Sequence, residues 1–501
     1  MQLLERINRR NIIAVGLTCV LALSLTRAVF GAQSYGFGEV YWQPDGVPVC
    51  LASGLQGMPH VTTGDAGGLI AAWADCRPSP TGCDIYAQRL GEDGDVLWQV
   101  DGAPVSTAPG DQLGPRIASD GVGGALITWS DFRNGTNYSV YAQRLDSMGN
   151  RLWGNDGITI TIGTRNQTVL EMASDALGGA FVIWEEWQGY PDNDVNLFAQ
   201  RIDHRSNLLW STPVTITAAP NEQYYGDSAS DGAGGFVVTW SDLRDTVNPN
   251  IYAQRVSASG VVLWTPDGAL VSPDPALQRP GYIVGDGTGG AYIAWYDFRS
   301  NAHYADAYMQ RLTPIGTRAW ELDLPVMANY DHAEGPNDLI PDGSGGAILI
   351  ASRYTNGAVE TDVLAQRINS DGELLWGTEP VNVTPWELQQ DFAVAVPDGE
   401  GGAYIAWIDK YTDKNGCDIW TQHIGANGAR LWPGHGVQAV GVIGSQEQPA
   451  VVSDGHNSFI VAWQDFRNGR YNPDLYAQRI GDFVAVTRFF LPLIQKNGKV
   501  E

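Results

Sequence analysis

The chain has 501 residues, of which 44% are hydrophobic and 10% aromatic, and its formal net charge is −26. Enough aromatic side chains are present to form a large core, which excludes a disordered chain. The acidic charge, with no basic patch along the sequence, excludes nucleic acid and anionic membrane surfaces as partners.

The N-terminus has the pattern of a secretory signal peptide. A basic segment (Arg6, Arg9 and Arg10) precedes an apolar stretch at residues 12–25 and small residues near Ala32. We therefore expect residues 1–32 to be a signal peptide and residues 33–39 a short linker. The apolar stretch is short for a transmembrane helix, although an uncleaved anchor remains an alternative. The expected location is secreted or cell-surface, without membrane insertion after cleavage.

The motif Asp-Gly-x-Gly-Gly recurs every 55 or 56 residues. Its second glycine is found at Gly68, Gly124, Gly179, Gly235, Gly290, Gly346 and Gly402, and Ser458 takes the eighth place. Each repeat contains four β-type runs, which in the second unit are residues 115–119, 125–130, 140–145 and 151–153. Such a period predicts an all-β protein, an eight-bladed β-propeller of four-stranded antiparallel blades over residues 40–481. Residues 482–501 form a C-terminal tail.

The two ends of the repeat region are out of phase. The first unit begins with the fourth run, ending at Trp42, and the last unit ends after its third run at Arg479. If the fourth run is outermost, the N-terminal strand completes the last blade. We therefore predict a ring closed by an N-terminal outer strand.

The most conspicuous residues repeat, which favours structural roles. Fifteen of the 18 tryptophans occupy two periodic positions, as expected for packing between blades. The glutamine of Tyr-Ala-Gln-Arg occurs in all eight units and is expected to satisfy backbone groups. Asp-x-Arg pairs in five units are expected to tie loops to blades. A repeated cation site, for example for calcium, is the alternative for these pairs, but no metal ligand set supports it and we expect no cofactor.

Four cysteines follow the predicted signal peptide. Cys76 and Cys83 flank one hairpin loop and are a candidate disulfide in an exported protein. Cys50 and Cys417 can be free or paired with each other.

The repeat text DGxGGAxxxWxDxR…DxYAQRLxxxGxxLW resembles repeats of secreted or surface-anchored bacterial β-propeller proteins. Residues 489–496 are similar to short "YLPL" endings of exported bacterial proteins, which implies export. A looser similarity is to sialidase-type propellers, whose Asp-box motif corresponds here to Ser370-Asp371-Gly372 and Trp376, with one extra residue before the tryptophan. These resemblances imply the fold and compartment rather than an activity.

Candidate ligand-binding residues lie where the repeats differ. The position eight residues before the second glycine holds His60, Arg116, Glu171, Asp227, Tyr282, Asp338, Val394 and Ala450. We expect this position at the start of the innermost strand, so that its side chains surround the mouth of the central channel. The alternative is that these side chains face solvent and vary freely.

Two units also replace Asp-x-Arg in the loop after the second strand. The third unit has Glu185, Glu186 and Trp187, and the sixth has Arg353 and Tyr354. We expect these loops to open on the same face as the variable ring, and we include the five residues among the candidate ligand-binding residues.

Two functional hypotheses follow. The first is an exported, non-enzymatic, monomeric propeller that binds a protein or carbohydrate and has no catalytic residues. The second is a glycoside hydrolase or lyase of sialidase-like type acting on acidic glycans. There Tyr282 would be the nucleophile, Glu171 and Asp227 the base and acid, and Arg116 and Arg353 the groups holding the substrate carboxylate.

Overall fold

The computed structural model describes residues 38–482, except for residues 58, 78–81, 162, 188, 190–193, 246, 301–302, 329–331, 356–360, 386–388 and 411–415. The predicted signal peptide, most of the predicted linker and nearly all of the predicted tail lie outside the described residues. Within the described part of the chain, no helix is long and apolar enough to cross a membrane.

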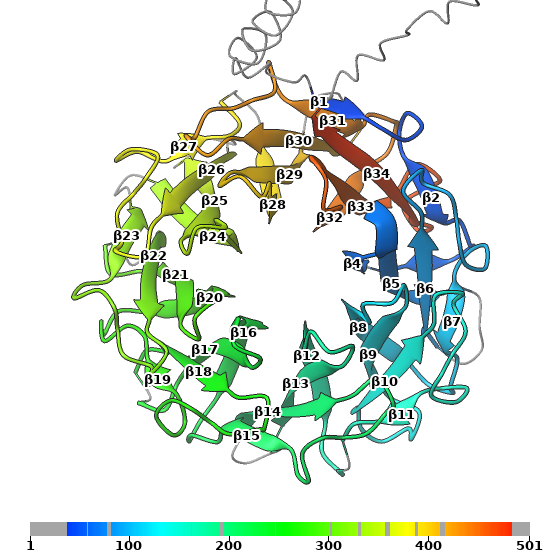
Figure 1. The fold of residues 1–501 in the computed structure, drawn as a ribbon, viewed down its shortest axis with the longest axis horizontal. Helices are drawn as coiled ribbons and strands as arrows, with labels where there is room; N and C mark the ends of the chain where they lie inside the picture. The colour runs from blue at the N-terminus through cyan, green and yellow to red at the C-terminus, as the bar shows by residue number, and fades with distance from the viewer. Residues whose placement is uncertain are drawn as a thin grey trace, which may run out of the picture. The chain divides into compact units, whose positions relative to one another are not determined.

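Eight antiparallel sheets are arranged around a common centre, which confirms the predicted eight-bladed propeller (Figure 1). The innermost strands are β4 (His60–Thr63), β8 (Gln112–Ser119), β12 (Gln167–Ser174), β16 (Gln223–Ser230), β20 (Gln278–Gly285), β24 (His332–Pro341), β28 (Gln390–Pro397) and β32 (Gln446–Ser453). In blade one, β3 (Leu55–Gln56) precedes β4, and a short 3-10 helix, η1 (Asp65–Gly67), follows it.

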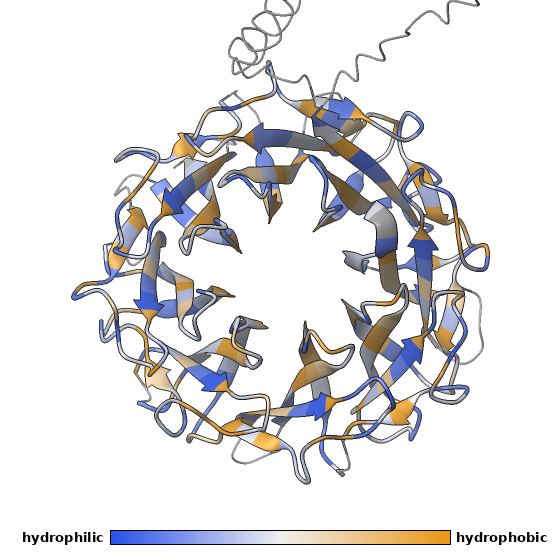
Figure 2. Ribbon diagram, in the orientation of Figure 1, coloured by the Kyte–Doolittle hydropathy of each residue, from blue (hydrophilic) through white to orange (hydrophobic). Residues whose placement is uncertain are grey.

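The second strands are the most buried. They are β5 (Leu69–Cys76), β9 (Ala125–Asp131), β13 (Ala180–Trp187), β17 (Phe236–Asp242), β21 (Ala291–Asp297), β25 (Ala347–Thr355), β29 (Ala403–Asp409) and β33 (Ser458–Asp465). The third strands are β6 (Asp84–Leu90), β10 (Ser139–Leu145), β14 (Val195–Ile202), β18 (Asn250–Val256), β22 (Asp306–Leu312), β26 (Thr361–Ile368), β30 (Asp418–Ile424) and β34 (Asp474–Asp482). Figure 2 shows hydrophilic segments on the third strands. In seven blades this strand carries a Gln-Arg pair, and in blade seven it carries Gln422 and His423.

The outer strands are short. They are β7 (Ala103–Ser106), β11 (Ile158–Thr159), β15 (Val214–Thr217), β19 (Ala269–Leu270), β23 (Leu324–Met327), β27 (Val381–Asn382) and β31 (Val437–Val440). In blade eight, β1 (Gly38–Val40) and β2 (Val47–Cys50) from the N-terminus both pair with β34. The predicted closure of the ring by the N-terminal strand is therefore confirmed.

The position predicted for the fourth strand was wrong by several residues. In blade two the prediction was residues 151–153, whereas β11 begins at Ile158 and Arg151 makes only an isolated bridge with Leu145. The tryptophan segment runs briefly beside the third strand, and the chain then turns before the outer strand begins. In blade one this turn places Asp101 and Gly102 at φ of 61° and 94°, which a regular strand does not allow.

The repeated glutamine bridges this break in the outer strand. Gln88 Oε1 accepts hydrogen bonds from the backbone N–H groups of Arg89 and Trp98, at 2.9 and 3.1 Å. Its Nε2 donates to the backbone oxygen of Gln99 at 2.7 Å. The amide therefore satisfies three backbone groups that the turn leaves without strand partners, as the sequence predicted.

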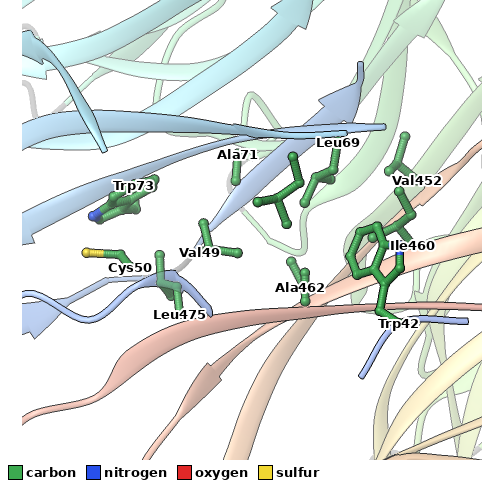
Figure 3. Packing of buried hydrophobic residues seen from close by; sticks show 12 residues of the cluster. Trp42, Val49, Cys50, Leu69, Ala71, Trp73, Val452, Ile460, Ala462 and Leu475 are labelled. Carbon is green, nitrogen blue, oxygen red and sulfur yellow. The ribbon is translucent and has the colours of Figure 1, made fainter. Parts of the chain in front are cut away.

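The tryptophans pack between neighbouring blades. Trp73 of blade one is fully buried and belongs to the same cluster as Ile460, Ala462 and Leu475 of blade eight. Figure 3 shows Trp73 and Trp42 at the two ends of this cluster, with Val49 between them. Each such contact extends the core around the ring.

A Trp-Asp-Arg-Tyr group recurs in blades one, two, four, five and eight. In blade two, Trp129 Nε1 and the Arg133 guanidinium both donate to Asp131, and the guanidinium lies 3.8 Å from the centre of the Tyr141 ring. Arg133 also donates to the backbone oxygen of Asp156, which precedes the outer strand. The predicted role of Asp-x-Arg in tying loops to blades is therefore observed.

Replacing the bridging amide should destabilise the ring. The Gln88→Leu change keeps a similar volume but leaves two N–H groups and one carbonyl without their partner. We expect a loss of about 3 kcal/mol in the free energy of unfolding, measured by chemical denaturation. Gln99→Leu is the matched control, because that side chain is exposed. Equal stabilities of the two variants would contradict the assigned role.

Candidate functional site

The variable ring residues lie in the middle of the inner strands, which corrects their predicted position at the strand start. In blade two, β8 begins at Gln112 and Arg116 follows a β-bulge, pairing with Thr128. The predicted strand start was too late because the strand does not end at the bulge: it continues beyond it towards the Asp-x-Arg end of the blade. Only His60 begins a strand, since blade one divides this segment into β3 and β4.

Arg116 and Glu171 join the inner strands of blades two and three. Arg116 Nε lies 3.3 Å from Glu171 Oε2 and donates to the backbone oxygen of Leu170 at 2.7 Å. The two side chains are 24% and 27% exposed. Burial lowers the pKa of His60 to about 3, and the positive charge of Arg116 acts in the same direction. His60 is therefore neutral at physiological pH.

Asp227 and Asp338 repeat one geometry in blades four and six. Each Oδ1 accepts the N–H of the following residue, and each Oδ2 accepts an N–H from the next blade, donated by Ile283 at 3.1 Å and Ala395 at 2.9 Å. Burial raises the pKa of Asp227 to about 7, with the charge of Glu171 acting in the same direction, and it raises the pKa of Asp338 to about 6. These carboxyl groups connect adjacent inner strands.

Two tyrosines border these acids. Tyr225 donates from its hydroxyl to Ser228 Oγ at 3.2 Å, and burial raises its pKa, with Glu171 and Asp227 acting in the same direction. Burial also raises the pKa of Tyr282, with the charge of Asp338 adding to it. Tyr225 was not predicted, since it lies two residues before the variable position. The titratable residues of the variable ring therefore come from blades one to six, whereas blades seven and eight contribute Val394 and Ala450.

The replaced loop of blade three forms a local cluster. Glu186 takes the place of the repeated aspartate and accepts hydrogen bonds from Gln167 and Arg165, at 2.7 and 3.2 Å. Trp187 Nε1 donates to Glu185 Oε1 at 3.1 Å, and burial raises the pKa of Glu185. Trp187 remains 47% exposed.

The replaced residues of blade six lie elsewhere. Arg353 Nε donates to Glu334 Oε1 at 2.5 Å, beside a cavity between blades five and six whose lining includes none of the variable ring residues. Tyr354 donates to Asp391 Oδ1 at 3.1 Å, and Lys410 pairs with the same carboxylate at 3.2 Å. Arg353 thus has its own partner rather than joining Arg116, Glu171 and Asp227 in one constellation.

The sequence analysis named two residues of an aromatic rim, Trp187 and Tyr354, and missed the other two. We use this term for Trp187, Tyr224, Tyr354 and Phe392, which lie at the Asp-x-Arg end of blades three, four, six and seven and are each more than two-fifths exposed. Tyr224 and Phe392 follow the repeated glutamine of their inner strands by one and two residues. A comparison of the repeats at these positions would have found them, because the equivalent residues of blade two are Leu113 and Gly114.

Cys76 and Cys83 are joined by a disulfide that closes the hairpin between β5 and β6. Cys50 is buried and free, and Cys417 is also free. Among the described residues, no group of three or more His, Cys, Asp or Glu side chains could hold a metal ion.

Comparisons with known proteins do not assign the chain to a family. No family model and no curated protein matches the chain. Ulvan lyase, a polysaccharide lyase, is 13% identical over 85% of this chain and 94% of its own, with a TM-score of 0.40. Dipeptidyl peptidase 4 from Porphyromonas gingivalis is 12% identical over 84% and 60%, with a TM-score of 0.45. NanB sialidase from Streptococcus pneumoniae is 9% identical over 88% and 71%, with a TM-score of 0.33. Similarities this low carry no argument about activity.

The raised pKa of Asp227 predicts a pH dependence of stability. Its folded pKa of about 7 exceeds that of an unfolded aspartate, about 4, so the unfolded chain binds fewer protons between these values. The free energy of unfolding should therefore fall as pH rises from about 4 to about 7. In Asp227→Asn this fall should be smaller, as measured by denaturation across the range. The control is Asp371→Asn, on an exposed turn; indistinguishable pH profiles for Asp227→Asn and the wild type would contradict the assignment.

Proposed function

We propose that this chain is an exported, non-enzymatic β-propeller that binds a carbohydrate or a protein through the aromatic rim. The observation that carries the proposal is that four exposed aromatic side chains, from blades three, four, six and seven, lie at the same end of the blades. Aromatic side chains supply most of the binding energy at protein interfaces, and exposed apolar surface often marks such a site.

Phe392 combines an unusual backbone conformation with an exposed apolar ring. This residue has φ of 52°, a conformation that costs on the order of 1–3 kcal/mol for a residue other than glycine. Gly114 holds the equivalent position in blade two, at φ of 60°. The phenyl ring is nevertheless 59% exposed, with Lys410 Nζ 5.4 Å from its centre. Gln448 of blade eight has the same conformation, at φ of 56°, so this backbone belongs to the repeated bulge of the inner strand. What distinguishes Phe392 is its exposed apolar ring, which a bound ligand would cover.

The polar groups of the rim favour a carbohydrate. Glu185, Asp391 and Lys410 stand beside Trp187, Tyr354 and Phe392. A sugar ring presents apolar C–H faces to aromatic side chains and hydroxyl groups to carboxylates and amines, so a glycan fits both kinds of group. A protein partner is the other ligand class to be tested.

The bonding of the variable ring argues against catalysis there. Asp227 and Asp338 already accept backbone N–H groups from adjacent blades, and Arg116 is paired with Glu171. A general acid or base must instead reach a substrate proton. The ring residues thus serve mainly to connect inner strands.

Two features support export. The N-terminal pattern of arginines followed by an apolar stretch is typical of a signal peptide. The disulfide between Cys76 and Cys83 suits an oxidising compartment.

A glycan-array screen of residues 33–501, followed by titration calorimetry with the best ligand, tests the proposal. Tyr354→Ala and Phe392→Ala, in the adjacent blades six and seven, should each weaken binding about tenfold or more, because each removes an aromatic contact beside Asp391 and Lys410. Leu177→Ala is the control, since Leu177 is an apolar residue that is 74% exposed on the turn after β12, at the other end of blade three. Unchanged affinity in both rim variants would rule out the rim as the site. A folded protein that binds no glycan would exclude the carbohydrate class and leave a protein partner.

The hydrolase or lyase hypothesis retains one supporting observation. Asp227, with a pKa of about 7, lies near Glu171 and Tyr225, and Arg116 is paired with Glu171. A carboxyl group with a raised pKa suits a general acid. If the protein is such an enzyme, it should release new chain ends from acidic polysaccharides, and Asp227→Asn should reduce the rate at least about 100-fold. No turnover of any acidic polysaccharide, or full activity in Asp227→Asn, would exclude this hypothesis.

A further inference from the structure

Blade six lacks the Trp-Asp-Arg-Tyr group that blade five retains. Ala351 takes the place of the tryptophan, Arg353 that of the aspartate, Thr355 that of the arginine and Leu364 that of the tyrosine. Blade six therefore has no arginine at the position from which the arginine of the five blades with this group contacts the segment before the outer strand.

A cavity of about 330 Å³ lies between blades five and six, next to these replacements. Residues of β22, β23, β24 and β25 and of the segment before β27 line it. Tyr308 and Met327 are among the lining residues, and the charged residues of the lining include Glu334, Arg353 and Glu379. This volume suits a small ligand or one long side chain.

Glu334 is the main polar group of the cavity. Its side chain is only 1% exposed, and its Oε1 accepts from Arg353, its cross-strand neighbour. No described residue donates a hydrogen bond to its Oε2. Every other blade has glutamine at this position. A buried carboxylate oxygen without a donor is costly, so a ligand that donates to it gains binding energy.

The charge of the lining selects a cation. Three lining residues are acidic, namely Asp306, Glu334 and Glu379, whereas Arg353 is the one basic residue among them. A ligand with one positive charge and several N–H donors matches this imbalance.

The sister blades show which cation the architecture accommodates. In blade five, the guanidinium of Arg299 donates to Asp297 and Asp323 and lies 4.2 Å from the centre of the Tyr308 ring. In blades one, two, four and eight the arginine likewise stacks on its tyrosine and binds its aspartate, but its partner beside the outer strand is a backbone oxygen. Blade six keeps acidic groups but lacks that arginine.

We propose that the cavity between blades five and six binds a guanidinium group presented by a ligand, which donates to Glu334 Oε2 and is attracted by Glu379. Tyr308 and Met327 form the wall against which the alkyl stem of the ligand packs. The guanidinium can belong to a free small molecule or to an arginine side chain of a peptide. This site is separate from the aromatic rim, so the two proposals fail or succeed independently.

Titration calorimetry on residues 33–501 with L-arginine amide and L-citrulline amide tests the inference. Citrulline carries a neutral urea of nearly the same shape, and its affinity should be at least about tenfold lower. A short peptide with a central arginine, assayed in parallel, distinguishes the sources: a peptide that binds about tenfold tighter than arginine amide identifies a peptide ligand. Absence of arginine amide binding, or equal binding of citrulline amide, would overturn the proposal.

Variants locate the binding site. Glu334→Gln installs the residue found in the other blades and should weaken arginine amide binding about tenfold or more. Glu379→Gln changes an exposed residue, so folding is preserved, and should weaken binding a few-fold. Asp371→Asn removes one surface charge outside the cavity and should leave affinity unchanged. The assignment is contradicted if both Glu379→Gln and Glu334→Gln bind arginine amide with full affinity. If Glu334→Gln does not fold, full affinity in Glu379→Gln alone contradicts it.

Discussion

The ring depends on one amide interaction repeated in every blade. The outer strand of each blade is interrupted by a turn after its tryptophan, and a buried glutamine of the third strand bonds both sides of that interruption. In blade eight this interaction joins the two ends of the ring: Gln478 accepts from the N–H of Trp42 and donates to the carbonyl of Gln43. The glutamine that bridges the break in the outer strand of seven blades therefore also joins the N-terminal and C-terminal segments in blade eight.

In seven blades an arginine then connects the blade to the next one, and in blade seven His423 takes its place, between Asp398 and Asp482. Arg144 of blade two binds Asp120, which shapes the turn of its own blade, and donates to the backbone oxygen of His204 in blade three. Because these partners are fixed by the repeat, the carboxylates of Asp-Gly-x-Gly-Gly are already occupied. The repeated acids thus account for the architecture, and binding chemistry is left to residues that differ between blades.

Much of this fold can be predicted from the sequence because the repeats have a nearly constant length. The interval of 55 or 56 residues specifies the blades, and the phase of Trp42 against Arg479 specifies how the ring closes. The outer strand was misplaced because its break depends on the side chain of a glutamine ten residues earlier, which a local pattern does not reveal. The candidate site was only partly predictable. The variation between repeats identified Arg116 and Glu171. The register shift at the bulge, and with it the exposure of Phe392, depends on how the strands pair, which the sequence pattern does not show.

The exchange of charge in blade six has a consequence for the history of the repeats. Glu334 and Arg353 are neighbours across two strands, whereas the equivalent pair in blade two is Gln112 and Asp131. A genetic crossover that fell between these two positions would place a buried glutamate beside an aspartate, or leave an arginine beside a neutral amide. The first product would contain a buried carboxylate without its counterion, because the side chain of Glu334 is only 1% exposed, and this costs several kcal/mol. We therefore expect tolerated crossovers among these similar repeats to fall outside residues 334–353, so that Glu334 and Arg353 are inherited together.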